Sequence, residues 1–230
     1  MITGFKQFGG DVLRRGSQFG IFGRTEPIST EFGFDRGLPI DRHYIENFLR
    51  THSGEIHGRT LEVGDDTYTR RFGGDRTQQR DTIHINPAEP ATFHGDLTVT
   101  GVLPSQAFDC IVITQTLHLL FDMALAIKRL RDALKPGGTL LVTVPGITPI
   151  AEDQWGKDWY WSLTPRALLR LLNEEFGVGQ TTISCFGNVF AASAFLYGLA
   201  TQEVSKRKLD RLDPRYPVIV GARTVRAATS

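Results

Sequence analysis

Residues 108–144 contain the pattern that most constrains the fold of this chain. An apolar run rich in β-branched residues at 108–113 is followed by a segment with one apolar face at helical spacing, and then by a second apolar run at 139–144. The sequence Lys-Pro-Gly-Gly at 135–138 ends the helix between them. A strand, a helix and a strand in this order predict two parallel strands joined by a helical crossover.

The rest of the chain continues this alternation. Strand-like runs recur at 60–63, 82–85, 92–94, 181–185 and 216–222, and helical periodicity recurs at 41–49, 164–172 and 188–204. This order predicts an α/β fold with a doubly wound, mostly parallel seven-stranded sheet. Only a few residues separate Asn86 from the next run, so we expect a reduced helix between the second and third strands.

Residues 1–40 differ from the remainder because they are rich in Gly and Phe and show no regular period. We expect them to form an N-terminal arm that lies on a single domain at 41–230. No internal repeat or low-complexity linker divides the chain further.

Composition and charge narrow the class of protein. Apolar residues make up 40% of the chain and charged residues 22%, as in soluble globular proteins, and the formal net charge is +1. A chain this close to neutral has no electrostatic footprint for nucleic acid or an acidic membrane surface, so neither is an expected partner. The longest apolar run, 189–200, is shorter than the stretch of about 20 residues that a membrane span needs, and residues 1–24 have no apolar signal-peptide core. We expect a cytoplasmic protein in which Cys110 and Cys185 are buried free thiols.

The segment LEVGDDTYTRRFGG starts like a nucleotide-binding loop but lacks the usual continuation. An apolar strand ends at Glu62 and is followed by Gly64, whereas Asp66 and Tyr68 stand where a Gly-x-Gly-x-Gly run has its second and third glycines. Glycines in such a loop allow close approach of a ligand and positive φ, and aspartate tolerates that conformation better than most residues. The segment is therefore either a ligand loop built another way or a residual turn capped by Asp65 or Asp66.

The order of these motifs resembles the class I S-adenosylmethionine-dependent methyltransferases over about residues 28–223. The segment FDCIVITQTLHLLFDMALAIKRLRDALKPGGTLLVTVPG resembles the fourth strand, following helix and fifth strand of that family, and LKPGG is its most specific part. GRTLEVG resembles the first strand with its acidic end, and FHGDLT resembles the third strand. The short link after HINP and the segment FGFDRGLPIDRHYIENFL resemble a branch of small, stand-alone enzymes, similar to methyltransferase type 11, found beside sugar-modifying and glycosyltransferase enzymes. The resemblance implies a Rossmann-like methyltransferase fold with S-adenosylmethionine as its cofactor.

The resemblance also implies cofactor-binding residues at the ends of the first four strands. It places Asp96 against the adenine, and Asn86 where the family has a carboxylate for the ribose diol, so a charge-assisted acceptor is lost. S-adenosylmethionine has an ammonium group and no phosphate, so an acidic loop suits it and disfavours NAD. The implied residues are Glu62, Gly64, Asp65, Asp66, Tyr68, Asn86, Pro87, Asp96, Leu97, Thr114 and Gln115.

Aromatic and charged residues outside these strand ends are candidates for the acceptor site. All three tryptophans lie in WGKDWYW after the fifth strand, where rings could stack on a sugar or a base, or form an apolar lid or dimer contact. Arginines before the first strand could clamp a carboxylate or phosphate, or pair with neighbouring aspartates. The candidate acceptor-binding residues are Arg36, Arg42, Trp155, Trp159 and Tyr160. The candidate bases for a hydroxyl acceptor are His118, Asp158 and His43.

Three functions follow from these patterns. The leading hypothesis is methyl transfer from S-adenosylmethionine to a small molecule, a sugar, nucleoside or glycosylated metabolite in bacterial secondary metabolism. The unusual loop motivates a second, in which the fold performs non-methylating chemistry on a nucleotide or sugar. The third is a non-catalytic partner of another biosynthetic enzyme that uses the helix at 188–204 as its interface, and the same helix could join two copies in a homodimer. His84, His94 and Asp96 match no metal-ligand spacing, so we expect no metal site.

Overall fold

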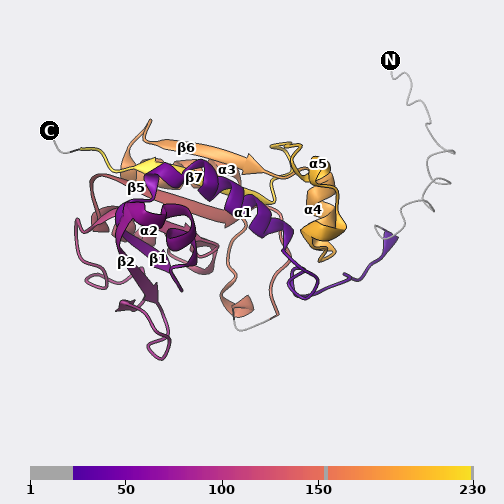
Figure 1. The fold of residues 1–230 in the computed structure, drawn as a ribbon, viewed down its shortest axis with the longest axis horizontal. Helices are drawn as coiled ribbons and strands as arrows, with labels where there is room; N and C mark the ends of the chain where they lie inside the picture. Colours follow the sequence, from indigo (N-terminus) through magenta and orange to yellow (C-terminus); the bar gives the residue numbers. More distant parts are fainter. Residues whose placement is uncertain (1–22, 153–154, 229–230) are drawn as a thin grey trace, which may run out of the picture.

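Seven strands form one sheet between two helical layers in the computed structural model, which describes residues 23–152 and 155–228 (Figure 1). The strand order is β3-β2-β1-β4-β5-β7-β6. The pairs from β3 to β5 are parallel, whereas β7 runs antiparallel to both of its neighbours. The predicted doubly wound, mostly parallel seven-stranded sheet is therefore confirmed. The strands are β1 (Gly58–Val63), β2 (Thr77–His84), β3 (Phe93–His94), β4 (Phe108–Thr114), β5 (Leu134–Pro145), β6 (Thr181–Phe186) and β7 (Ile219–Val225).

The helices cover the two faces of the sheet unequally. Helices α2 (Met123–Ala133) and α3 (Pro165–Phe176) pack on one face. Helix α1 (Ile40–Thr51) lies along the other face, with α4 (Val189–Leu196) and α5 (Lys206–Leu209) near its end (Figure 1). No helix in the described part of the chain is long and apolar enough to cross a membrane.

The central strand β4 shows how the two hydrophobic cores are separated. Successive residues of a strand point to opposite faces. Ile111 and Ile113 accordingly join the core under α2 and α3, while Cys110 and Val112 join the core under α1 and α4. Both cysteines are free, and Cys110 is buried as predicted, whereas Cys185 on β6 is only half-buried. Burial on both faces explains why this run is almost continuously apolar.

The connections among the first four strands contain no α-helix longer than the two residues 67–68. After β1 the chain makes a π-helical turn at Thr69–Gly73 and a 3-10 turn at Gly74–Arg76. Residues 85–92 and 95–107 form only turns and bends. The predicted reduction between the second and third strands is confirmed, and the structure extends it to both neighbouring connections. This half of the sheet is therefore bordered by loops and by the short helical segment after β1.

The described part of the N-terminal arm packs against the segment after α4. Ile28 donates its N–H to the carbonyl of Tyr197 at 2.9 Å. Gly198 has φ +72°, and a Cβ there would lie 2.1 Å from the carbonyl oxygen of Ser29, so only glycine allows this approach. The helix predicted at 188–204 was too long, because Gly198 breaks it shortly after Leu196. The first 22 residues of the expected arm lie outside the described residues.

Phe48 fixes α1 to the sheet, which makes it a test of the fold. Its ring is 1% exposed and fills the space over Gly221 of β7, where a Cβ would lie 2.7 Å from the ring. Phe48→Ala should lower the free energy of unfolding by about 3–5 kcal/mol, because it removes a buried ring and leaves a cavity. Urea unfolding followed by circular dichroism measures this.

Phe121→Ala is the matched control because its ring is 70% exposed. It should change the free energy of unfolding by less than about 1 kcal/mol. Equal losses in the two variants would contradict the packing of α1 described here.

Candidate functional site

A cavity of about 1100 Å³ opens along the carboxyl edge of the parallel strands. In open α/β sheets, ligands bind at this edge. The cavity is covered by what we call the roof, which consists of residues 30–34 of the arm and residues 148–152 and 155–160 after β5. The strand-end residues that line it include Val63, Gly64, His84, Asp96, Leu97 and Gln115.

The turn after β1 is held by the carboxylate of Glu62, which is 3% exposed. One oxygen accepts the N–H of Tyr68 at 3.1 Å and the other accepts the N–H of Thr69 at 2.8 Å. These N–H groups begin a short helical segment and have no partner within it. Burial raises the pKa of Glu62 to about 7, although both donors favour the carboxylate. Glu62 thus supports the loop and does not line the cavity.

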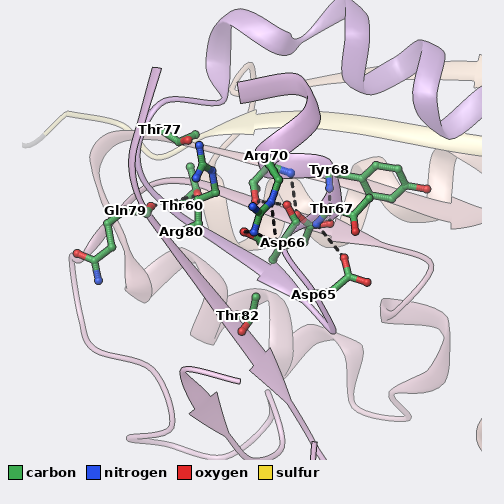
Figure 2. A network of polar contacts seen from close by, with 12 residues as sticks. Thr60, Asp65, Asp66, Thr67, Tyr68, Arg70, Thr77, Gln79, Arg80 and Thr82 are labelled. Atoms are coloured by element: carbon green, nitrogen blue, oxygen red, sulfur yellow. Dashed lines mark hydrogen bonds and ion pairs between the residues drawn. The ribbon is translucent and has the colours of Figure 1, made fainter. Parts of the chain in front are cut away.

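The two aspartates of the loop are also engaged within it (Figure 2). Asp65 accepts the N–H of Thr67 at 2.8 Å, and Asp66 pairs with Arg70 at 2.7 Å. Neither aspartate lines the cavity. Gly64 does, with φ +86° and no atom within 4 Å of where a Cβ would stand. The loop therefore offers a ligand the bare backbone of Gly64 rather than its acidic side chains.

Tyr68 acts on the cavity through Arg42. The Arg42 guanidinium interacts electrostatically with the Tyr68 hydroxyl and lies 5.6 Å from the ring centre of Phe34. It also lies 3.9 Å from the carboxylate of Asp41, which is 8% exposed. Burial raises the pKa of Asp41. Asp41 and Arg42 both line the cavity, so α1 presents a buried carboxylate and a restrained cation to it.

At the end of β2, the cavity is lined by His84 rather than by the predicted Asn86. The side chain of Asn86 accepts the N–H of Ala88 at 3.0 Å, and neither Asn86 nor Pro87 lines the cavity. His84 does, and its Nδ1 accepts the N–H of Asn86 at 3.0 Å, which leaves Nε2 available to a ligand. Sequence reasoning missed His84 because it counted the strand end two residues late. The strand register identifies His84. Val63, the last residue of β1, pairs with Ile83, so β2 ends at the next residue, His84.

The ends of β3 and β4 supply further polar groups. Asp96 lines the cavity beside the buried Leu97, and its Oδ1 accepts hydrogen bonds from the N–H and hydroxyl of Thr98. Gln115 lies in the left-handed region with φ +48°, and its Nε2 is buried without a partner in the described residues. Thr114 does not line the cavity. Asp96 and Gln115 therefore line the same cavity from the ends of β3 and β4.

His118 lies under the roof and is 1% exposed. Its carbonyl accepts the N–H groups of Tyr160 and Trp161, and its ring centre lies 4.5 Å from that of Trp159. Burial lowers the pKa of His118 to about 4, so the imidazole is neutral at neutral pH. Its Nδ1 and the Trp159 Nε1 are buried with no hydrogen-bond partner among residues 23–152 and 155–228. His118 both anchors the roof and presents an unpaired nitrogen.

Aromatic rings form much of the roof. Phe32 of the arm stacks on Trp159 with centres 6.0 Å apart and planes 9° apart. Trp155 and Tyr160 also line the cavity, together with Asp158. The predicted acceptor-binding aromatics are thus brought together over the strand ends.

Two predicted residues lie away from the cavity. Arg36 forms an ion pair with Glu203 beside the arm. The Nε2 of His43 lies 3.3 Å from a carboxylate oxygen of Asp210, at the end of α5. Neither side chain lines the cavity, so the roles predicted for them have no support from this geometry.

Comparisons with known proteins identify the family and the shared fold of this chain. A family model described as a methyltransferase domain matches residues 32–176, more than half of the chain. The chain therefore belongs to the methyltransferase-domain family. No curated protein sequence matches it significantly.

Solved structures share the fold at low sequence identity. The [4+2]-cyclase SpnF has a TM-score of 0.55 at 16% identity over 82% of each chain. A methyltransferase dependent on S-adenosylmethionine from Mesorhizobium loti has a TM-score of 0.54 at 18% identity over 81% of this chain and 98% of that one. A phosphoethanolamine N-methyltransferase from Haemonchus contortus, in complex with S-adenosylhomocysteine, has a TM-score of 0.53 at 10% identity over 81% of this chain and 53% of that one.

S-adenosylmethionine is the cofactor of this family, and the cavity fits it. The backbone at Gly64 is open, and His84, Asp96 and Gln115 offer polar atoms at successive strand ends. The unpaired Gln115 Nε2 is a buried donor that a ligand can satisfy. Arg42 is the one lysine or arginine among the described residues that line the cavity, which suits a cofactor without phosphate.

The raised pKa of Glu62 gives a test of how the loop is built. Because the folded pKa of about 7 lies above the ordinary value of 4.5, the contribution of Glu62 to stability is largest at low pH and is lost as the pH rises to about 7. Between about pH 5 and about pH 8, wild type should lose about 2 kcal/mol relative to Glu62→Gln, which does not titrate. Urea unfolding of both proteins at the two pH values measures the difference. A difference that does not change with pH would contradict the burial of this carboxylate.

Proposed function

We propose that this chain catalyses methyl transfer from S-adenosylmethionine to a small molecule, with a sugar, nucleoside or glycosylated metabolite as the acceptor. The size of the cavity at the strand ends carries the proposal. At about 1100 Å³ it exceeds the about 300–1,000 Å³ typical of a site for one small molecule. It therefore has room for an acceptor beside the cofactor.

We assign the cofactor to the part of the cavity over the strand ends. Gly64 exposes its backbone there, Asp96 and Gln115 offer polar atoms, and Leu97 supplies a buried apolar surface. His84 takes the place at the end of β2 that the sequence assigned to Asn86. When bound, S-adenosylmethionine supplies a methyl group already activated by its sulfonium. These residues need only hold it, orient it and exclude water.

We assign the acceptor to the part under the roof. Trp155, Trp159 and Tyr160 present flat surfaces on which a sugar or base can stack. Asp158 and His118 are the proposed proton acceptors, since Asp158 forms no ion pair in the described residues and the Nδ1 of His118 is unpaired. Asp41 joins them because a buried carboxylate with a raised pKa binds a proton more readily.

A second candidate is a methyltransferase fold that performs other chemistry. The engagement of Asp65 and Asp66 within their own loop favours it, because neither acidic side chain reaches the cavity. The [4+2]-cyclase SpnF has this fold, so the fold alone does not decide the reaction.

Calorimetric titration with S-adenosylmethionine and S-adenosylhomocysteine tests the cofactor assignment. We expect dissociation constants in the micromolar range, equivalent to about −8 kcal/mol. Absence of heat and of thermal stabilisation at millimolar ligand would reject methyl transfer. Binding of both ligands without any methyl loss in the presence of candidate acceptors would favour the second candidate.

Gly64→Ala should weaken S-adenosylhomocysteine binding at least about tenfold, because the added methyl group enters the cavity and φ becomes strained. Gly101→Ala is a matched control: Gly101 also has φ +86° and open space around a Cβ, but it does not line this cavity. The control should lose similar stability and keep its affinity. Equal affinity in the two variants would remove Gly64 from the site.

A further inference from the structure

The roof carries three carboxylates that form no ion pair within the described residues. Glu31 belongs to the arm, and Glu152 and Asp158 belong to the segment after β5. None of their carboxylate groups takes part in a salt bridge or a hydrogen bond in the part of the chain that the structure describes. All three line the cavity, so their charge acts on whatever lies beneath the roof.

The charge of the whole cavity is negative, like that of the roof. Arg42 is its one described lysine or arginine, and this guanidinium already lies beside Asp41. S-adenosylmethionine brings one net positive charge, which leaves most of the carboxylates uncompensated. The carboxylate residues that line the cavity are Glu31, Asp41, Asp96, Asp122, Glu152 and Asp158.

The aromatic rings of the roof also favour a cationic ligand. The faces of aromatic rings attract cations, and groups of such rings bind ammonium ligands. The roof already shows one such contact, because the Arg42 guanidinium lies 5.6 Å from the ring centre of Phe34. Trp159 and Tyr160 line the cavity beside Asp158, so rings and a carboxylate occur together.

His118 is an independent indication that a ligand belongs under the roof. It is 1% exposed, lines the cavity and keeps its Nδ1 without a partner among the described residues. Buried polar atoms in native proteins are nearly always paired, so this nitrogen points to a polar group supplied by a ligand. Its neutral imidazole adds no positive charge to oppose a cation.

We infer that the acceptor is cationic: the roof recognises a molecule that presents an amine, and it discriminates against molecules that present a phosphate or a carboxylate. That this molecule is the methyl acceptor rests on the proposed function, whereas the preference of the roof for a cationic ligand does not. It narrows the proposed acceptors to amine-bearing sugars, nucleosides or glycosylated metabolites and disfavours nucleotides and sugar phosphates.

Tryptophan fluorescence tests the inference, because all three tryptophans lie in the segment after β5. The probes are phenethylamine, phenethyl alcohol and hydrocinnamate, which share a phenyl ring and differ in the charge of the head group. Each is titrated with and without saturating S-adenosylhomocysteine. We expect the amine to bind about tenfold or more tighter than hydrocinnamate, with the alcohol between them. Raising the salt concentration should reduce the preference.

The double variant Glu152→Gln, Asp158→Asn removes two of the unpaired charges and should lose most of the preference for the amine. The matched control is Asp75→Asn, Glu89→Gln, which changes the net charge equally at two exposed residues that do not line the cavity. Glu31→Gln tests the opposite side of the roof independently. Thermal melting confirms that each variant is folded.

The outcomes separate the two proposals. Amine preference that the control keeps and the double variant loses supports the inference. Binding of S-adenosylhomocysteine without any amine preference overturns the inference and leaves the proposed function standing. Amine preference without any binding of S-adenosylhomocysteine supports the cation site and rejects methyl transfer. Equal loss of preference in the double variant and the control overturns the assignment to the roof.

Discussion

The two hydrogen bonds that reach the carboxylate of Glu62 decide how the first half of the sheet is built. They satisfy the N–H groups of Tyr68 and Thr69, so the chain can turn directly after β1 without a run of glycines. The connection to β2 is then short enough to need only a π-helical and a 3-10 turn. Gly64 remains open to the cavity, and Tyr68 is placed against Arg42. The loop, the cavity edge and the position of one cation thus depend on one buried carboxylate.

The sheet could be predicted from the sequence because its signals are local. The run at 108–113 is apolar on both faces, and the Lys-Pro-Gly-Gly that follows the next helix stops that helix within a few residues. Helix length after β6 was predicted less well. The apolar residues from 189 onward suit a helix, but Gly198 is needed in a left-handed conformation where the arm approaches, and that contact is not local.

The candidate site was predicted only in part, because side-chain direction depends on strand register and on local hydrogen bonds. Asp65, Asp66 and Asn86 stand at the right places in the sequence, yet each accepts a hydrogen bond from a nearby residue of its own loop instead of facing the cavity. His84 faces the cavity because the register with β1 ends β2 earlier. The roof joins the arm to the segment after β5 through the stacking of Phe32 on Trp159, a contact that no spacing rule predicts.

Three buried polar atoms without a partner among the described residues lie around one cavity: the Nε2 of Gln115, the Nδ1 of His118 and the Nε1 of Trp159. A buried donor or acceptor left unpaired costs about 1–3 kcal/mol, because it has lost its hydrogen bonds to water without replacing them. Sites of this kind discriminate strongly against an analogue of the same shape that lacks a hydroxyl or an amine. Such an analogue leaves the buried protein group without a hydrogen-bond partner. The cavity should therefore tolerate changes in the size of its ligands more readily than the loss of a single polar group from them.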